Sequence, residues 1–129
     1  MRVSFSKAQF QQIERGMIRQ EAPAIARRLR LDFPQTFHDT SDDELLLFSN
    51  ACVEQALALG DLDNVEQAYQ LAAVNSQIPR IDADPVGRAY FDAIAGSDTV
   101  RGGKKIELLH RNLSHYFEGA PDSGGHSDA

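Results

Sequence analysis

The sequence predicts an all-α fold, a compact orthogonal bundle of five or six helices, and three observations support this. Apolar residues recur at steps of three and four along most of the chain, which is the period of a helix with one buried face. Helix-capping residues precede several of these stripes. No segment of useful length alternates apolar and polar residues as a strand does. The length of 129 residues fits one domain, and short polar links favour a bundle over a long coiled coil.

The first helical segment is predicted to begin at a capping box formed by Ser6 and Gln9. Two apolar stripes follow it: Phe10, Ile13 and Met17, and then Ile18, Ala22, Ile25 and Leu29. Pro23 lies inside this run, and proline lacks an N–H and clashes with the carbonyl four residues earlier. We therefore expect a kink or break near residues 19–21, and a second segment that ends at about Leu31, before Phe33-Pro34.

A long helix is predicted over residues 41–59. Ser41 and Glu44 form a second capping box, and three acidic residues lie at the positive end of the helix dipole. Gly60 follows the last apolar residue and is expected to end the helix in a left-handed conformation. Apolar residues cover so much of this helix that we expect it to be the central and most buried one.

Three further segments complete the predicted bundle. One runs from about residue 65 to before Pro79, with an inner stripe of Val65, Ala68, Tyr69, Ala72 and Ala73. The next begins at Asp84-Pro85, stops at Gly96 and has the stripe Val86, Ala89, Tyr90, Ala93 and Ile94. The last begins between Thr99 and Lys104 and carries Ile106, Leu109, Leu113 and Phe117. We expect a single helical domain over residues 1–118 and a disordered, flexible tail over 119–129.

The charge of the chain is unevenly distributed. The formal net charge is −6, so we expect no general attraction to nucleic acid. Residues 1–33 sum to +4, residues 34–98 to −10 and residues 99–118 to +2. This polarity is either an ordinary solvated surface or a means of orienting a protein partner. One cysteine, no signal-peptide pattern and no apolar run of membrane length together predict a cytoplasmic protein without a membrane partner.

No complete catalytic, cofactor-binding or metal-binding site is predicted. Glu107 and His110 have the spacing of a di-iron ligand pair, but the second pair and the further carboxylates are missing. Cys52 lies on an apolar stripe among acidic neighbours, which favours a buried thiol over a reactive one. Gly102-Gly103-Lys104 lacks the first glycine and the Ser or Thr of a phosphate-binding loop. We therefore predict that the protein is not an enzyme.

The order of several short motifs resembles a family of small helical proteins. These motifs are Arg-Leu-Asp-Phe-Pro at 30–34, Ser-Asp-Asp-Glu-Leu at 41–45, Glu-Gln-Ala-Leu-Ala-Leu-Gly at 54–60, Val65 with Tyr69 and Leu71, Asp84-Pro85 and Lys104-Lys105-Ile106. The pattern resembles accessory proteins encoded beside VgrG, PAAR-domain and effector genes in bacterial type VI secretion clusters. The turn at Leu59-Gly60-Asp61 is shorter than the Tyr-Gly-Ile turn and loop of many members. The resemblance implies binding of a secreted effector, VgrG or PAAR protein and transfers no catalytic residue.

Two functions remain open at this point. The first is a non-enzymatic adaptor or chaperone-like factor for a type VI effector or spike component, and the second is an immunity protein that neutralises a cognate toxin through its acidic middle region. Either function needs exposed apolar or arginine anchors, because such side chains dominate binding energies. The candidate partner-binding residues are Arg27, Arg28, Phe37, Tyr90 and Tyr116. The sequence does not indicate the oligomeric state.

Overall fold

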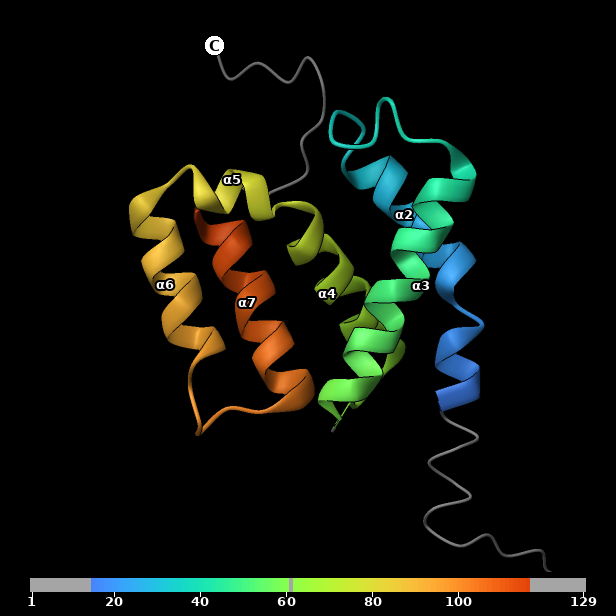
Figure 1. The fold of residues 1–129 in the computed structure, drawn as a ribbon. Helices are drawn as coiled ribbons and strands as arrows, with labels where there is room; N and C mark the ends of the chain where they lie inside the picture. The colour runs from blue at the N-terminus through green and yellow to red at the C-terminus, as the bar shows by residue number, and fades with distance from the viewer. Residues whose placement is uncertain (1–14, 61, 117–129) are drawn as a thin grey trace, which may run out of the picture.

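A computed structural model describes residues 15–60 and 62–116 (Figure 1). Helices make up most of these residues, which include no strand, and the predicted all-α bundle is confirmed. Residues 15–19 are helical, and the following helices are α2 (Ala22–Asp32), α3 (Asp42–Leu59), α4 (Val65–Ser76), α5 (Ile78–Asp82), α6 (Pro85–Ala95) and α7 (Gly102–Tyr116). The capping box at Ser6, the end of the domain and the tail at 119–129 lie outside the described residues.

A proline lies at each end of α2, Pro23 in its first turn and Pro34 shortly after its last residue. A turn at residues 20–21 separates it from the preceding helical residues, as predicted. Pro23 lies in the first turn of α2, where a missing N–H costs no hydrogen bond. At the other end, the Phe33 N–H donates to the carbonyl of Leu29 at 2.8 Å, and Pro34 prevents further helix.

The predicted limits of α3 are also confirmed. The Glu44 N–H donates to Ser41 Oγ at 3.1 Å, and the Ser41 N–H donates to Glu44 Oε1 at 3.0 Å, which completes the capping box. The helix ends at Leu59, before Gly60. Gly60 has the positive φ expected of a terminating glycine, 76°, but its ψ of 176° is extended rather than left-handed helical.

Helix α4, and not α3, is the most buried helix of the described residues, so the prediction for residues 41–59 is wrong. Three consecutive leucines at 45–47 span about 200° of a helix, so they cannot all face one core. Leu47 is accordingly 70% exposed. Helix α4 contacts α2, α3, α5 and α7, and it crosses the middle of the molecule in Figure 1. Its Ala68, Ala72 and Ala73 are fully buried.

The region after α4 differs from the sequence prediction in two ways. Helix α4 ends at Ser76, before Pro79, as predicted, but Pro79 lies in the first turn of a further short helix, α5, that the sequence did not predict. In α6, four of the five residues predicted to face inward are exposed: Val86, Ala89, Tyr90 and Ala93. Phe91 and Ile94 pack against the core instead. Helix α6 lies at the edge of the bundle beside α7, so only a narrow strip of its surface is covered (Figure 1).

A buried glutamine joins the start of α4 to α7. Gln67 is fully buried, and its side-chain amide donates to Glu107 Oε2 at 2.6 Å while its Oε1 accepts the Asp63 N–H at 2.7 Å. Gly103 makes room for this amide, because a Cβ at that position would lie 2.1 Å from Gln67 Oε1. The second glycine of Gly102-Gly103-Lys104 therefore has a packing role.

We predict that Gly103→Ala destabilises the protein by about 2 kcal/mol, because the new methyl displaces Gln67 and leaves buried polar groups without partners. The free energy of unfolding in urea measures this effect. Gly16→Ala is the matched control, since its Cβ would meet nothing within 4 Å and it lies in helical residues. The control should be neutral or up to about 1 kcal/mol more stable. Equal effects of the two substitutions would refute the packing role of Gly103.

Candidate functional site

The first surface of interest is an open groove between α2 and α3, which pack against each other. Its volume is about 520 Å³. The groove is lined by one face of each helix: Pro23, Ala26, Arg27, Arg30 and Leu31 from α2, and Asp42, Leu45 and Leu46 from α3. These residues recur at steps of three and four, which places them along the groove on adjacent helix turns. We call this surface the α2–α3 groove.

Apolar side chains from both helices line much of the α2–α3 groove. Ala26 and Leu45 are buried and form part of the core. Leu46 is half-buried, and Leu31 is 80% exposed. A leucine that adjoins an apolar groove and is open to water gains free energy when a partner covers it, at roughly 25 cal/mol per Å² of apolar area removed from water. The groove therefore offers a continuous apolar contact surface.

Two arginines on the edge of the α2–α3 groove differ in their partners. Arg30 donates to the carbonyls of Phe37 at 3.0 Å and Thr40 at 2.7 Å, and to Asp42 Oδ1 at 3.1 Å. These bonds fix the loop before α3. Arg27 is exposed and makes no hydrogen bond or ion pair within the described part of the chain. Its guanidinium is therefore available for an ion pair at the edge of the groove.

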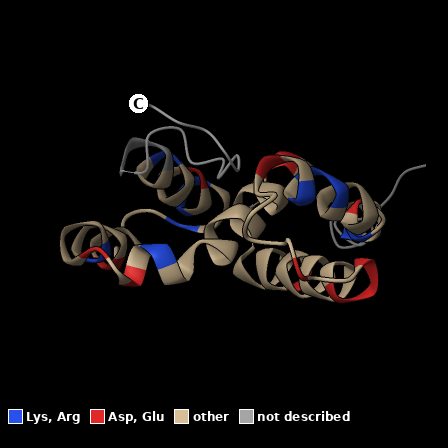
Figure 2. Cartoon of the chain, turned by 90° about the horizontal axis from the view of Figure 1, so that it is seen from above, with Lys and Arg blue, Asp and Glu red and all other residues tan. Residues whose placement is uncertain are grey.

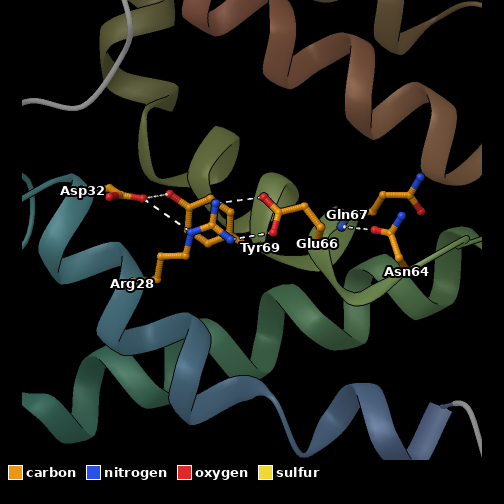
Figure 3. Close-up of polar contacts among 6 residues, drawn as sticks. All are labelled: Arg28, Asp32, Asn64, Glu66, Gln67 and Tyr69. Carbon is orange, nitrogen blue, oxygen red and sulfur yellow. Dashed lines mark hydrogen bonds and ion pairs between the residues drawn. The ribbon is translucent and has the colours of Figure 1, made fainter.

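Arg28 lies on a different face of α2 and contacts α4 (Figure 3). It donates to both carboxylate oxygens of Glu66, at 2.6 and 2.8 Å, and its guanidinium carbon lies 3.7 Å from the centre of the Tyr69 ring. The Tyr69 hydroxyl donates to Asp32, one turn after Arg28. This arrangement satisfies the charge of Arg28 within the fold, so Arg28 holds α2 against α4.

The same cluster extends to α7 through a histidine. The rings of Tyr69 and His110 meet edge to face, with centroids 6.4 Å apart. Burial is the main cause that raises the pKa of Tyr69, and the bond to Asp32 adds to it. Burial also lowers the pKa of His110, because the charged imidazolium is poorly solvated there. Both groups are therefore neutral near pH 7, and the cluster joins three helices.

The other predicted anchors do not join Arg27 in one site. Phe37 is only 6% exposed and packs against Phe48, with ring centroids 5.9 Å apart, so its assignment as an exposed anchor is wrong. The sequence placed Phe37 in a polar loop, but that loop folds onto the core through Arg30. Tyr90 is 55% exposed on α6. Tyr116 is the last residue of α7, and its side chain is not among those described.

Leu31 and Leu46 line the α2–α3 groove but were not predicted from the sequence as partner-binding residues. One signal was available for Leu31. It lies two positions after the buried Leu29, about 200° around the helix, and so could not share its face. A leucine on the polar face of an amphipathic helix indicates a surface contact. No comparable signal exists for the groove itself, because its shape depends on how α2 and α3 pack.

The residues considered from the sequence as catalytic or metal-binding candidates make contacts that hold the fold together. Glu107 contacts Gln67, and His110 contacts Tyr69. Among the described residues, no three His, Cys, Asp or Glu side chains gather so that they could hold a metal ion. Cys52 is 3% exposed, as predicted, and the Asn75 amide donates to its Sγ at 3.5 Å.

We compared the chain with models of known protein families, with curated proteins and with solved structures, and none of them matches. The type VI resemblance therefore rests on the sequence motifs alone. No helix of the described residues has the length and apolar character needed to cross a membrane.

We predict that His110 makes stability fall as the solution is acidified. Because burial lowers the pKa of His110 in the folded state, the unfolded state binds the proton more readily. The stabilisation is complete above the unfolded pKa of about 6.5 and is lost as pH falls toward the folded pKa. Urea unfolding at pH 7.5 and 5.5 measures it. His110→Gln should reduce the loss, whereas the control His38→Gln, at an exposed loop position, should not. An unchanged loss in His110→Gln would contradict this cause.

We predict that Cys52 reacts slowly with a thiol reagent in the folded protein. Burial raises the pKa of the Cys52 thiol and blocks access to it. The rate with an aromatic disulfide at pH 8 should be on the order of a hundredfold lower than in urea. Similar rates in both solutions would show that the thiol is accessible.

Proposed function

We propose that the protein is a non-enzymatic binding factor that holds a helical segment of a protein partner in the α2–α3 groove. The observation that carries this proposal is an apolar groove that continues onto the exposed Leu31 and is bordered by Arg27, which has no partner among the residues that the structure describes. Helix-in-groove recognition uses apolar anchors at steps of three and four, and two packed helices present such a receptor. An acidic residue beside those anchors would pair with Arg27.

We propose the partner to be a type VI effector or a VgrG or PAAR spike component, with this protein as its adaptor or chaperone. Support for this context comes from the resemblance of the motifs between residues 30 and 106. An adaptor needs a binding surface and no reaction centre. Glu107 and His110 are half-buried and contact Gln67 and Tyr69, and Cys52 is buried in the core.

The second candidate is an immunity protein, and one observation favours it. Acidic residues gather where α3 begins, and the side chains of Asp39 and Asp42 are each 96% exposed. Such a surface could cover the basic site of a toxin. Deleting the gene separates the two functions. Loss of effector secretion without toxicity supports the adaptor, whereas self-intoxication supports the immunity protein.

The adaptor proposal predicts a partner whose binding depends on Leu31. Tagged wild-type protein should retain an effector, VgrG or PAAR protein from cells that express the native locus. Leu31→Gln should weaken this binding by about tenfold or more, or about 1.4 kcal/mol, because the leucine is a central apolar anchor. Titration of the purified partner by calorimetry measures the change.

Leu47→Gln is the matched control, since Leu47 is 70% exposed on α3 and does not line the groove. It should bind the partner as the wild type does. Circular dichroism should show both variants folded. Capture of no such partner, or equal affinity of the Leu31 and Leu47 variants, would contradict the proposal.

A further inference from the structure

A second hollow lies on the opposite part of the molecule, along the outer face of α7. Its volume is about 460 Å³, and its lining residues are Thr99, Val100, Arg101, Lys104, Glu107, Leu108 and Arg111. Lys104, Leu108 and Arg111 recur at steps of three and four, so they share one face of the helix, and Arg101 directly precedes its first residue. We call this surface the α7 groove.

Cations dominate the α7 groove although the chain as a whole is acidic. Among the described residues, Arg101, Lys104 and Arg111 line it together with one carboxylate, that of Glu107. Figure 2 shows how basic and acidic residues are distributed over the ribbon. The −6 net charge thus conceals a local excess of positive charge. Such an excess raises the local concentration of anionic groups.

The cations of the α7 groove are only weakly neutralised within the fold. Lys104 Nζ lies 3.8 Å from Asp63 Oδ2 and 3.7 Å from Glu107 Oε1, and its side chain is 70% exposed. Arg101 Nε donates to the carbonyl of Asp98 at 3.5 Å. Arg111 makes no hydrogen bond or ion pair with the described residues. The Glu107 carboxylate accepts from the buried Gln67 amide through Oε2, and only its Oε1 faces Lys104.

The spacing and the lining residues favour a peptide over other anions. Arg101 and Arg111 are ten positions apart, or about 15 Å along a helix, which exceeds the reach of one phosphate or carboxylate. Val100 and Leu108 are half-buried, line the same groove as the cations and offer apolar contacts. None of the lining residues that the structure describes is aromatic, whereas single-stranded nucleic acid binds on stacking aromatic rings.

We infer that the α7 groove binds an acidic peptide segment whose carboxylates are interleaved with apolar side chains. Arg101, Lys104 and Arg111 pair with the carboxylates, and Val100 and Leu108 contact the apolar side chains. This site does not depend on the α2–α3 groove, with which it shares no lining residue.

Fluorescence anisotropy with two labelled peptides tests this inference on the full chain. The probe is a twelve-residue peptide of alternating Glu and Val, and the reference peptide has Gln in place of every Glu. At low salt, the wild type should bind the Glu peptide about fivefold or more tightly than the Gln peptide. Raising the salt should weaken binding of the Glu peptide.

Variants of equal net charge separate a local site from general attraction. Arg101→Gln combined with Arg111→Gln should weaken binding of the Glu peptide about fivefold or more. The control, Arg15→Gln combined with Lys105→Gln, removes the same charge outside the groove and should bind within about twofold of the wild type. Equal losses in both double variants, or no preference for the Glu peptide, would overturn the inference. Tighter binding of a single-stranded oligonucleotide would also overturn it.

Discussion

Helix α4 packs closely against α2, α3, α5 and α7, and the rest of the structure depends on this packing. Ala68, Ala72 and Ala73 have small side chains and are fully buried, so α3 and α7 can both approach the α4 backbone. Two polar contacts then fix the arrangement. The Gln67 amide donates a hydrogen bond to Glu107 of α7. The Tyr69 hydroxyl donates to Asp32 of α2, and its ring contacts His110 of α7. Because buried polar groups must find partners, these contacts specify one packing of the helices.

This central position of α4 leaves outer helix faces free for binding. The core-facing sides of α2 and α3 meet α4, and their opposite edges leave an apolar groove bordered by Arg27. Helix α7 directs Ile106, Leu109 and Leu113 into the core and leaves its cations on the outer face. The two proposed sites therefore differ in character. The α2–α3 groove gains binding energy from apolar burial, and the α7 groove gains it from charge.

Local signals in the sequence predicted the helices well, because caps and prolines act within a few residues. The capping box at Ser41, the N-cap at Asp84, the break before α2 and the stop at Gly60 are examples. Burial was predicted less well, since it depends on neighbours that the sequence does not reveal. The apolar stripe around Tyr90 is exposed because α6 is an edge helix, and Phe37 is buried because Arg30 folds its loop inward. Of the anchors predicted from the sequence whose side chains the structure describes, Arg27 alone lines the α2–α3 groove.

The central claim is that the α2–α3 groove is the surface that a protein partner covers. Methyl NMR spectra, recorded while the captured partner is added to labelled protein, test it most directly. If a partner covers the groove, the Ala26, Leu31 and Leu46 methyl signals should shift or broaden, and the Val86 methyl signals on α6 should not change. Shifts confined to Val86 and its neighbours on α6, with the groove methyl signals unmoved, would contradict it.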